Sequence, residues 1–228
     1  FLLAGVPGCG KTLFGKAASH RLGIPLVEFN PSACEASLVG ETGDRMRTAL
    51  QTIDAVSPCV LLVDEGEKAF GSGGERDSGS KETLRREFLT WANDRKSRVF
   101  VVMTANNVTA MPPEMKRAKR WDESYFVDLP HREERVAIIQ VHLRKRKRQF
   151  DDAEVEALAD ATEGYSGAEL EAGIAKAIRK CFTQGKRELR PEDVAKQYKR
   201  IVPQSEGSQV KELRAWAKES NAVLASRP

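Results

Sequence analysis

The residues with the clearest capacity for chemistry stand near the start of the chain, in the run GVPGCGKT at positions 5–12. Its glycines let backbone N–H groups curl around phosphate oxygens, and the start of a helix directly after them adds a favourable dipole. Lys11 would reach the β- and γ-phosphates of a nucleotide, and Thr12 would offer its hydroxyl to Mg²⁺. An apolar run precedes the motif and a helix-like stretch follows it, so we favour a phosphate-binding loop over a chance glycine-rich turn.

Two acidic residues close a second apolar run, VLLVDE at positions 60–65. We expect Asp64 to hold Mg²⁺ through water and Glu65 to polarise the water that attacks the γ-phosphate of ATP. Acidic residues at the carboxyl end of a strand belong in the ligand crevice of an open α/β sheet. A solvated turn would explain the pair if it stood alone, but the phosphate-binding loop makes an ATP site the better interpretation.

A third apolar run, VVMTANN at positions 101–107, ends in two amides. One amide at the tip of a strand is suited to orienting the water or contacting the γ-phosphate. Without the other two motifs, an asparagine that helps a turn would be the simpler explanation.

The elements that must position these residues follow an alternating pattern. Apolar runs typical of strands buried on both faces occur at residues 1–4, 24–29, 59–63, 98–104 and 125–128. Helix-like stretches lie between them at residues 11–22, 41–55 and 81–94. This alternation predicts a parallel α/β sandwich over residues 1–130, with a Gly- and Ser-rich loop at residues 66–82.

The pattern changes at residue 131, where apolar residues take on helical spacing. Four successive apolar faces are Val136, Ile139, Leu143; Val155, Leu158, Ala159; Leu170, Ile174, Ile178, Phe182; and Val194, Tyr198, Ile201. They predict a small all-helical subdomain over residues 131–202, with residues 203–228 as a helical tail that frays. Ser166 and Glu169 form a capping box ahead of the third face.

Composition limits the class of protein without naming a partner. The 228 residues are 40% hydrophobic and 31% charged, which is typical of a globular protein with a buried core, and no apolar run is long enough to span a bilayer. The net charge of +4 does not identify a partner. Four widely spaced cysteines and three histidines favour free thiols in a reducing compartment over a metal cluster, so we expect a cytoplasmic protein.

Taken together, four motifs resemble those of the AAA branch of the AAA+ ATPases. GVPGCGKT is similar to the Walker A motif, VLLVDE to Walker B, TANNVTAMPPEMKRAKRWDE to the second region of homology, and GYSGAEL to the signature of the helical lid. Within the branch, SLVGE and TANN resemble a group described from chloroplast reading frames and found in many bacteria. The resemblance implies a P-loop NTPase sandwich followed by a helical lid, ATP and Mg²⁺ as cofactors, and assembly into a hexameric ring.

The resemblance also implies roles for individual residues. Asn106, rather than Asn107, takes the sensor-1 position, and Arg117 and Arg120 take the positions of arginine fingers that act on ATP bound by the neighbouring subunit. The implied catalytic residues are Lys11, Glu65, Asn106, Arg117 and Arg120. The implied nucleotide-binding residues are Gly5, Pro7, Gly8, Cys9, Gly10, Lys11, Thr12, Leu13, Asp64, Gly167 and Ala168, of which Thr12 and Asp64 serve the metal and the last two lie near the adenine.

Two features of the chain depart from the family pattern. Leu38, Val39 and Gly40 occupy the place of the first pore loop, where many members that thread polypeptide carry an aromatic residue. The family also has a segment before Walker A that helps to seat adenine, whereas only four residues precede Gly5. If nothing lies upstream in the natural protein, we expect weak nucleotide affinity.

The function expected from these features is ATP hydrolysis coupled to the remodelling of a protein client by a ring of identical subunits. A nucleic-acid motor or loader is the first alternative, and it rests on the basic run RKRKR at residues 144–148. No aromatic residue is interleaved with that run, so a solvated helix end is preferred. A scaffold that binds nucleotide as a switch is the second alternative, and the presence of Glu65, Arg117 and Arg120 argues against it.

Overall fold

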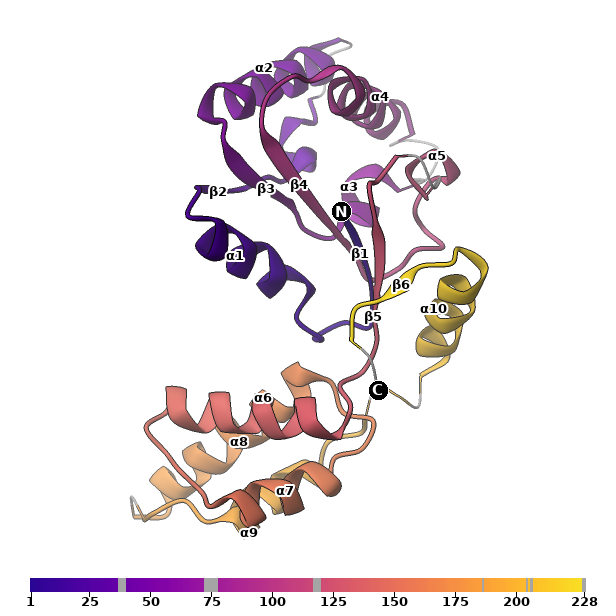
Figure 1. Ribbon diagram of the computed structural model, residues 1–228. Helices are drawn as coiled ribbons and strands as arrows, with labels where there is room; N and C mark the ends of the chain where they lie inside the picture. The colour runs from indigo at the N-terminus through magenta and orange to yellow at the C-terminus, as the bar shows by residue number, and fades with distance from the viewer. Residues whose placement is uncertain are drawn as a thin grey trace. The chain divides into compact units, whose positions relative to one another are not determined.

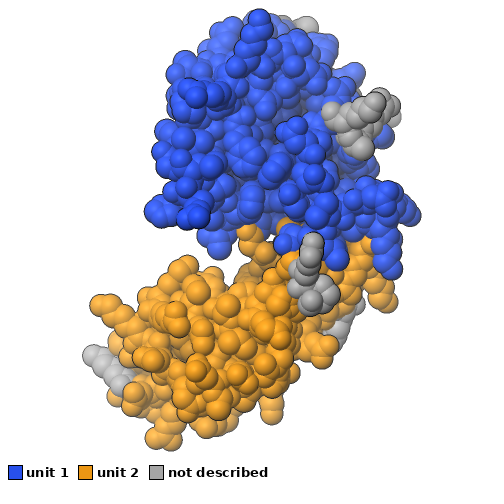
Figure 2. Space-filling model, viewed as in Figure 1, with its two compact units in different colours: residues 1–5, 11–126, 215–225 blue, residues 6–10, 127–214, 226–228 orange. Residues whose placement is uncertain are grey.

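The computed structural model describes residues 1–36, 40–71, 78–116, 120–185, 187–203, 205 and 207–226. Three residues singled out above, Leu38, Val39 and Arg117, lie outside this set. The chain divides into two compact units (Figure 2). Unit 1 comprises residues 1–5, 11–126 and 215–225, and unit 2 comprises residues 6–10, 127–214 and 226–228.

Unit 1 is organised around a six-stranded sheet in the order β2-β3-β4-β1-β5-β6 (Figure 1). Its strands are β1 (Leu2–Gly5), β2 (Leu26–Glu28), β3 (Cys59–Val63), β4 (Val99–Ala105), β5 (Ser124–Val127) and β6 (Val223–Leu224). The pairs β2–β3, β3–β4, β4–β1 and β5–β6 are parallel. The α/β sandwich predicted from the alternating pattern is therefore confirmed.

The central strands are buried because their sequences are apolar throughout. All five residues of β3 are buried, as are all residues of β4 except Phe100. The register pairs Ala4 with Ala105 and Val63 with Met103, so the carboxyl ends of β1, β3 and β4 lie at one edge of the sheet, with β3 ending two residues before β4. Residues that follow these three strands are thereby brought to one edge, which is where ligands bind in open α/β sheets.

Helices of unit 1 pack against this sheet and against one another. They are α1 (Lys11–Leu22), α2 (Glu41–Val56), α3 (Gly66–Phe70), α4 (Ser78–Asp94) and α5 (Pro113–Lys116), with a 3₁₀ turn η1 at Pro31–Cys34. Helix α1 packs on β3, and α2 packs on α4. Short helix α3 and the start of α4 lie within the segment predicted as a Gly- and Ser-rich loop, so that prediction was wrong for residues 66–70 and 78–82, while residues 72–77 lie outside the described set. Ala69 and Phe70 are buried there, which shows that the segment contributes to the core.

The segment expected to be a helical tail contains a strand as well as a helix. Helix α10 (Ser208–Glu219) buries Val210, Leu213 and Ala217, and β6 then pairs with β5 at the edge of the sheet. A two-residue strand has no periodicity to detect, and its partner β5 lies far back in the sequence. Pattern analysis therefore missed it.

Unit 2 contains a helical bundle made of α6 (Arg132–Lys145), α7 (Asp152–Asp160), α8 (Gly167–Thr183) and α9 (Pro191–Tyr198). The four predicted apolar faces meet in one core, in which Ile139, Leu158, Ile174 and Val194 are almost fully buried. Phe182 is an exception, since it is 63% exposed near the end of α8. The predicted capping box is present, because the Ser166 N–H donates to Glu169 Oε2 at 2.7 Å and the Glu169 N–H donates to Ser166 Oγ at 3.3 Å.

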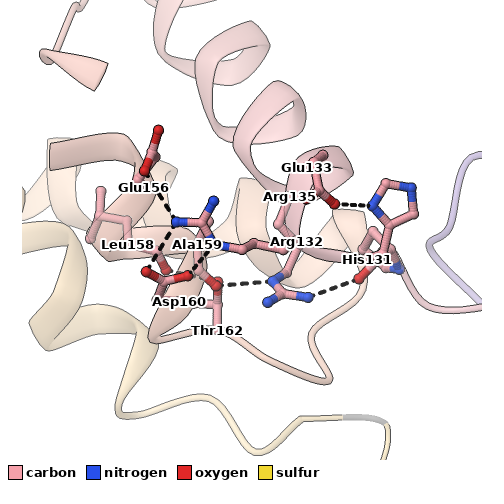
Figure 3. Close-up of polar contacts among 10 residues, drawn as sticks. His131, Arg132, Glu133, Arg135, Glu156, Leu158, Ala159, Asp160 and Thr162 are labelled. Atoms are coloured by element: carbon pink, nitrogen blue, oxygen red, sulfur yellow. Dashed lines mark hydrogen bonds and ion pairs between the residues drawn. The ribbon is translucent and has the colours of Figure 1, made fainter. Parts of the chain in front are cut away.

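A buried arginine ties the start of the bundle to its second helix (Figure 3). Arg135 is only 7% exposed, and it donates from Nε to the carbonyl of Ala159 and from Nη1 to the carbonyl of Pro130, both at 3.0 Å. Beside it, Arg132 pairs with Asp160, with 2.5 Å between Nε and Oδ1. These contacts hold the first turn of α6 against the end of α7. None of the helices in the described part of the chain has the length and hydropathy needed to cross a membrane.

Candidate nucleotide site

Two threonines from different elements donate to one carboxylate oxygen of Asp64. Asp64 directly follows β3, Thr12 is the second residue of α1, and Thr104 lies near the end of β4. The Thr12 hydroxyl donates to Asp64 Oδ1 at 2.9 Å, and the Thr104 hydroxyl donates to the same oxygen at 2.5 Å. Thr104 is 1% exposed, so its hydroxyl is committed to this network.

The oxygen atoms of this cluster suit a magnesium ion. Mg²⁺ takes hard oxygen ligands, and protein sites for it commonly supply one or two carboxylates while water and substrate phosphates complete the octahedron. Thr12 Oγ1 and Asp64 Oδ1 lie 2.9 Å apart within unit 1, and each presents the kind of oxygen that such a site requires. The residues named from the sequence as metal-binding therefore fit the ion.

Glu65 adopts an uncommon backbone conformation between β3 and α3. Its φ is 51°, in the left-handed region that non-glycine residues seldom occupy and that is enriched at functional sites. The Glu65 N–H donates to Thr104 Oγ1 at 2.9 Å, so one hydroxyl holds both acids that end the β3 motif. Thr104 was not named from the sequence, where its signal is a single polar residue inside an apolar strand.

Both carboxylate oxygens of Glu65 have partners in the structure. Oε1 accepts from Asn106 Nδ2 at 3.0 Å, and Oε2 pairs with Lys68 Nζ at 2.5 Å. Lys68 has a side chain that is 69% exposed, and its hydrogen bond with Glu65 raises the pKa of the ammonium group. Lys68 was not recognised from the sequence, because it fell in the segment predicted as a loop.

The two amides at the tip of β4 have different partners. The Asn106 side chain reaches Glu65, whereas Asn107 Oδ1 accepts from the Thr109 N–H at 3.1 Å and from the Thr109 hydroxyl at 2.6 Å. Asn107 therefore stabilises a turn. Of the two, Asn106 is the amide that meets the acidic pair.

Lys11 begins α1 and folds back towards the start of the loop. It is 6% exposed, and its Nζ donates to the Gly5 carbonyl at 2.9 Å. Within the loop, Gly8 and Gly10 have φ values of 75° and 91°, which L-residues with side chains rarely adopt. Cys9 Sγ lies 3.8 Å from the Pro7 carbonyl, and Leu13 is 62% exposed.

Within unit 2, the loop contacts the N-terminus of α8. The Ala168 N–H donates to the Gly8 carbonyl at 3.0 Å. A Cβ atom on Gly8 would come within 2.7 Å of Ala168 Cβ, and one on Gly167 would come within 3.1 Å of the Gly8 carbonyl oxygen. This approach thus requires a glycine at position 8 and leaves little room for a side chain at position 167, and the structure brings together three residues named from the sequence.

Other named residues stand apart from the acidic pair or cannot be placed. Arg120 is exposed, and its Nη1 donates to Asn93 Oδ1 at 3.0 Å, at the end of α4. Gly40, with a φ of 89°, precedes the first turn of α2. Arg117, Leu38 and Val39 lie outside the described residues, so their predicted roles stay predictions.

Comparison with known proteins finds one matching family model and similar proteins. The model for the ATPase family associated with various cellular activities (AAA) matches residues 1–129. The chain is 38% identical over 229 residues to the AAA domain-containing protein ycf46 of Guillardia theta, covering 99% of this chain and 45% of that protein. It is 30% identical over 207 residues to the ATP-dependent zinc metalloprotease FtsH of Acidothermus cellulolyticus, covering 88% of this chain and 31% of that protein.

The chain thus spans less than half the length of these relatives. Two crystal structures of the FIGL-1 AAA domain, one of them in complex with ADP, superpose with a TM-score of 0.77 at 22% and 23% identity. They cover 96% of this chain, and the chain covers 77% and 76% of theirs, so the fold is shared over nearly its whole length. Fold, family match and relatives agree: the chain belongs to the AAA family of ATPases.

Proposed function

We propose that this protein hydrolyses ATP and couples hydrolysis to the remodelling of a protein client, as a hexameric ring whose active sites are shared between subunits. The observation that carries the proposal is the network at the sheet edge. Asp64 is held by the hydroxyls of Thr12 and Thr104, and Glu65 is held by the side chain of Asn106. A hydroxyl, two acids and an amide are the groups that phosphoryl transfer to water requires beside a phosphate-binding loop.

Each residue has a stated task in this proposal. Lys11 and the loop N–H groups bind the β- and γ-phosphates, while Thr12 and Asp64 hold Mg²⁺, which neutralises charge on the phosphate oxygens. Glu65 polarises the attacking water, and Asn106 orients that water or the γ-phosphate. Residues 1–130 serve as the nucleotide-binding subdomain and residues 131–202 as its lid, with Gly167 and Ala168 near the adenine.

One contact of Glu65 works against its role in this proposal. Oε1 accepts from Asn106 and Oε2 pairs with Lys68. Each carboxylate oxygen has two lone pairs, so both oxygens can still accept from water, but the Lys68 ammonium makes the carboxylate a weaker base towards that water. Since Lys68 is largely exposed, its ion pair is the contact that solvent and a bound nucleotide can most readily replace.

Sharing of sites between subunits rests on the arginines that follow α5. We propose that Arg117 and Arg120 reach ATP bound by a neighbouring subunit, where an arginine is worth about 10³–10⁵ in rate. Arg120 is exposed and contacts Asn93 on the end of α4, so its guanidinium is accessible to a second molecule. Leu38, Val39 and Gly40 are proposed as a pore loop that contacts the client.

We prefer a protein client to a nucleic acid for two reasons: the name of one relative, and an ion pair within the basic run. FtsH is by name an ATP-dependent metalloprotease, and from it we carry over only the dependence on ATP and the protein client. The run at residues 144–148 is not a continuous free cationic surface, because Arg146 pairs with Glu171 at 2.8 Å. A nucleic-acid motor therefore has no observation in its favour beyond composition.

The test is ATPase activity per mole of protein against protein concentration. Specific activity should rise and saturate, because assembly completes each site, and added Arg120→Ala subunits should inhibit the wild type. High, flat specific activity at nanomolar concentration, together with a monomer mass, would overturn the shared site. Glu65→Gln should bind ATP without turnover, while Glu82→Gln, which alters an exposed carboxylate of the same unit, should turn over normally. Rapid turnover by Glu65→Gln would remove Glu65 from the proposal.

A further inference from the structure

A second glutamate of the β3–α3 segment is buried against the tip of β4. Glu67 is 8% exposed, and its Oε1 accepts from two successive backbone N–H groups, those of Asn106 at 2.9 Å and Asn107 at 3.2 Å. Its Oε2 is also buried, and within the described part of the chain it has no hydrogen-bond partner. Burying a carboxylate is costly unless it is hydrogen-bonded, and the two N–H groups offset part of that cost.

The contact is made to the residue that meets Glu65. Asn106 is held at two points by acids two positions apart in the sequence: its side-chain amide donates to Glu65 Oε1, and its backbone N–H donates to Glu67 Oε1. The neighbouring Asn107 is held through its N–H in the same way, while its side chain closes the turn. The backbone at the base of the Asn106 side chain is therefore fixed by Glu67.

We propose that Glu67 is a positioning residue for ATP hydrolysis, which sets the backbone of Asn106 so that the amide meets Glu65; the inference rests on the proposed ATPase function. Glu67 itself touches neither nucleotide nor water in this proposal. Its effect passes through Asn106. This role can be distinguished from that of a residue that only holds α3 against the sheet. If Glu67 acts by positioning Asn106, changing Glu67 should have no further effect on the rate once the Asn106 side chain has been removed.

The first experiment compares Glu67→Ala with Glu67→Gln. The alanine leaves two N–H groups without their acceptor and lets the turn relax, and misplacement of a catalytic group by about 1 Å costs on the order of 100-fold in rate. We expect kcat to fall by about 10- to 100-fold with KM within about twofold. The glutamine keeps an accepting oxygen at the same reach, so it should restore kcat to within about threefold of the wild type.

The decisive experiment is a double-mutant cycle on kcat with Asn106→Ala. If Glu67 acts through Asn106, Glu67→Ala should add less than about twofold to the loss caused by Asn106→Ala. A purely structural role would instead multiply the two losses. Asp54→Ala is the matched control: this carboxylate of unit 1 also accepts two hydrogen bonds, from Trp91 Nε1 at 2.9 Å and from Ser97 Oγ at 2.5 Å, and its effect on kcat should show no coupling to Asn106.

The outcomes separate this inference from the proposed function. If Asn106→Ala hydrolyses ATP normally, the proposed role of Asn106 falls and the role of Glu67 falls with it. If Asn106→Ala is impaired while Glu67→Ala keeps wild-type kcat, or if the two losses multiply, only the role of Glu67 is overturned. Should Glu67→Ala fail to fold, Glu67→Asp takes its place in the cycle, because the shorter side chain withdraws the acceptor and keeps the charge.

Discussion

Replacing Thr104 with valine tests the hydrogen-bond network at the sheet edge most directly. The two side chains have nearly the same shape, and Thr104 is 1% exposed, so packing is retained. Two hydrogen bonds are lost: the one that Thr104 donates to Asp64 at 2.5 Å and the one that it accepts from the Glu65 N–H at 2.9 Å. Valine can replace neither.

The size of the effect follows from these two bonds. A hydrogen bond to a charged group contributes about 1.5–3 kcal/mol, and a buried donor left without an acceptor costs about 1–3 kcal/mol. Asp64 is exposed, so water recovers part of the loss, and we expect the free energy of unfolding to fall by about 2 kcal/mol. With a urea slope of about 2 kcal/mol/M, the midpoint of unit 1 should move down by about 1 M.

The rate of ATP hydrolysis should fall as well. Glu65 sits in a sparsely populated backbone conformation, and the Thr104 hydroxyl is the group that holds its N–H. Without that contact we expect the carboxylate to lose its placement, at a cost of about 10- to 100-fold in kcat. Thr104→Ser keeps both hydrogen bonds and should recover most of the activity, although it loses a buried methyl group.

The assays are urea unfolding and steady-state ATPase activity of the same preparations. Thr162→Val is the control, because this fully buried hydroxyl donates to the carbonyls of Leu158 at 2.8 Å and Ala159 at 3.1 Å within unit 2. It should change unfolding without changing kcat. If Thr104→Val shifted the midpoint by less than 0.2 M (about 0.4 kcal/mol at that slope) and kept kcat within about twofold, the network would have no role in holding the acids.

Three further predictions concern single contacts. Lys68→Met should raise basal ATPase activity by about two- to fivefold, because it frees one oxygen of Glu65; lower activity would mean that Lys68 orients that carboxylate. Arg135→Met should lower the urea stability of unit 2 by about 2 kcal/mol, since two carbonyls lose a buried donor, and an unchanged midpoint would contradict this. Burial lowers the pKa of His142, so the unfolded chain takes up its proton first as pH falls. The stability present above about pH 6.5 should therefore decline as the pH falls below that value, and His142→Gln should flatten that decline.

Local patterns were sufficient for the main elements of both units. Strands such as β3 are continuous apolar runs because both faces are buried, and the helices of unit 2 show one apolar face each. Such features can be recognised from a few neighbouring residues, without knowing which distant segments they contact. The AAA motifs likewise placed Thr12, Asp64 and Glu65 near one another, because parallel strands end at one edge.

The features that were missed depend on contacts between distant segments. Thr104 and Glu67 act on residues about 40 positions away in the sequence, as the separations of 39 and 40 for their hydrogen bonds show. Glu67 was further concealed because glycines and serines around it indicated a loop, whereas tertiary packing of Phe70 stabilises a short helix there. Strand β6 depends on pairing with β5 in the same way. Propensity cannot supply such information.

The arrangement of partners separates two groups of residues in the proposed site. Lys11 and Thr12 are the first two residues of α1, whereas Thr104, Asn106 and Glu67 join the tip of β4 to the β3–α3 segment. Thr104 contacts both acids, through the Asp64 carboxylate and the Glu65 N–H. We therefore infer that changes in the first group weaken nucleotide binding, and that changes at the β4 tip leave binding intact while slowing hydrolysis. Nucleotide dissociation constants that rose equally for changes in both groups would show instead that the sheet edge behaves as a single unit.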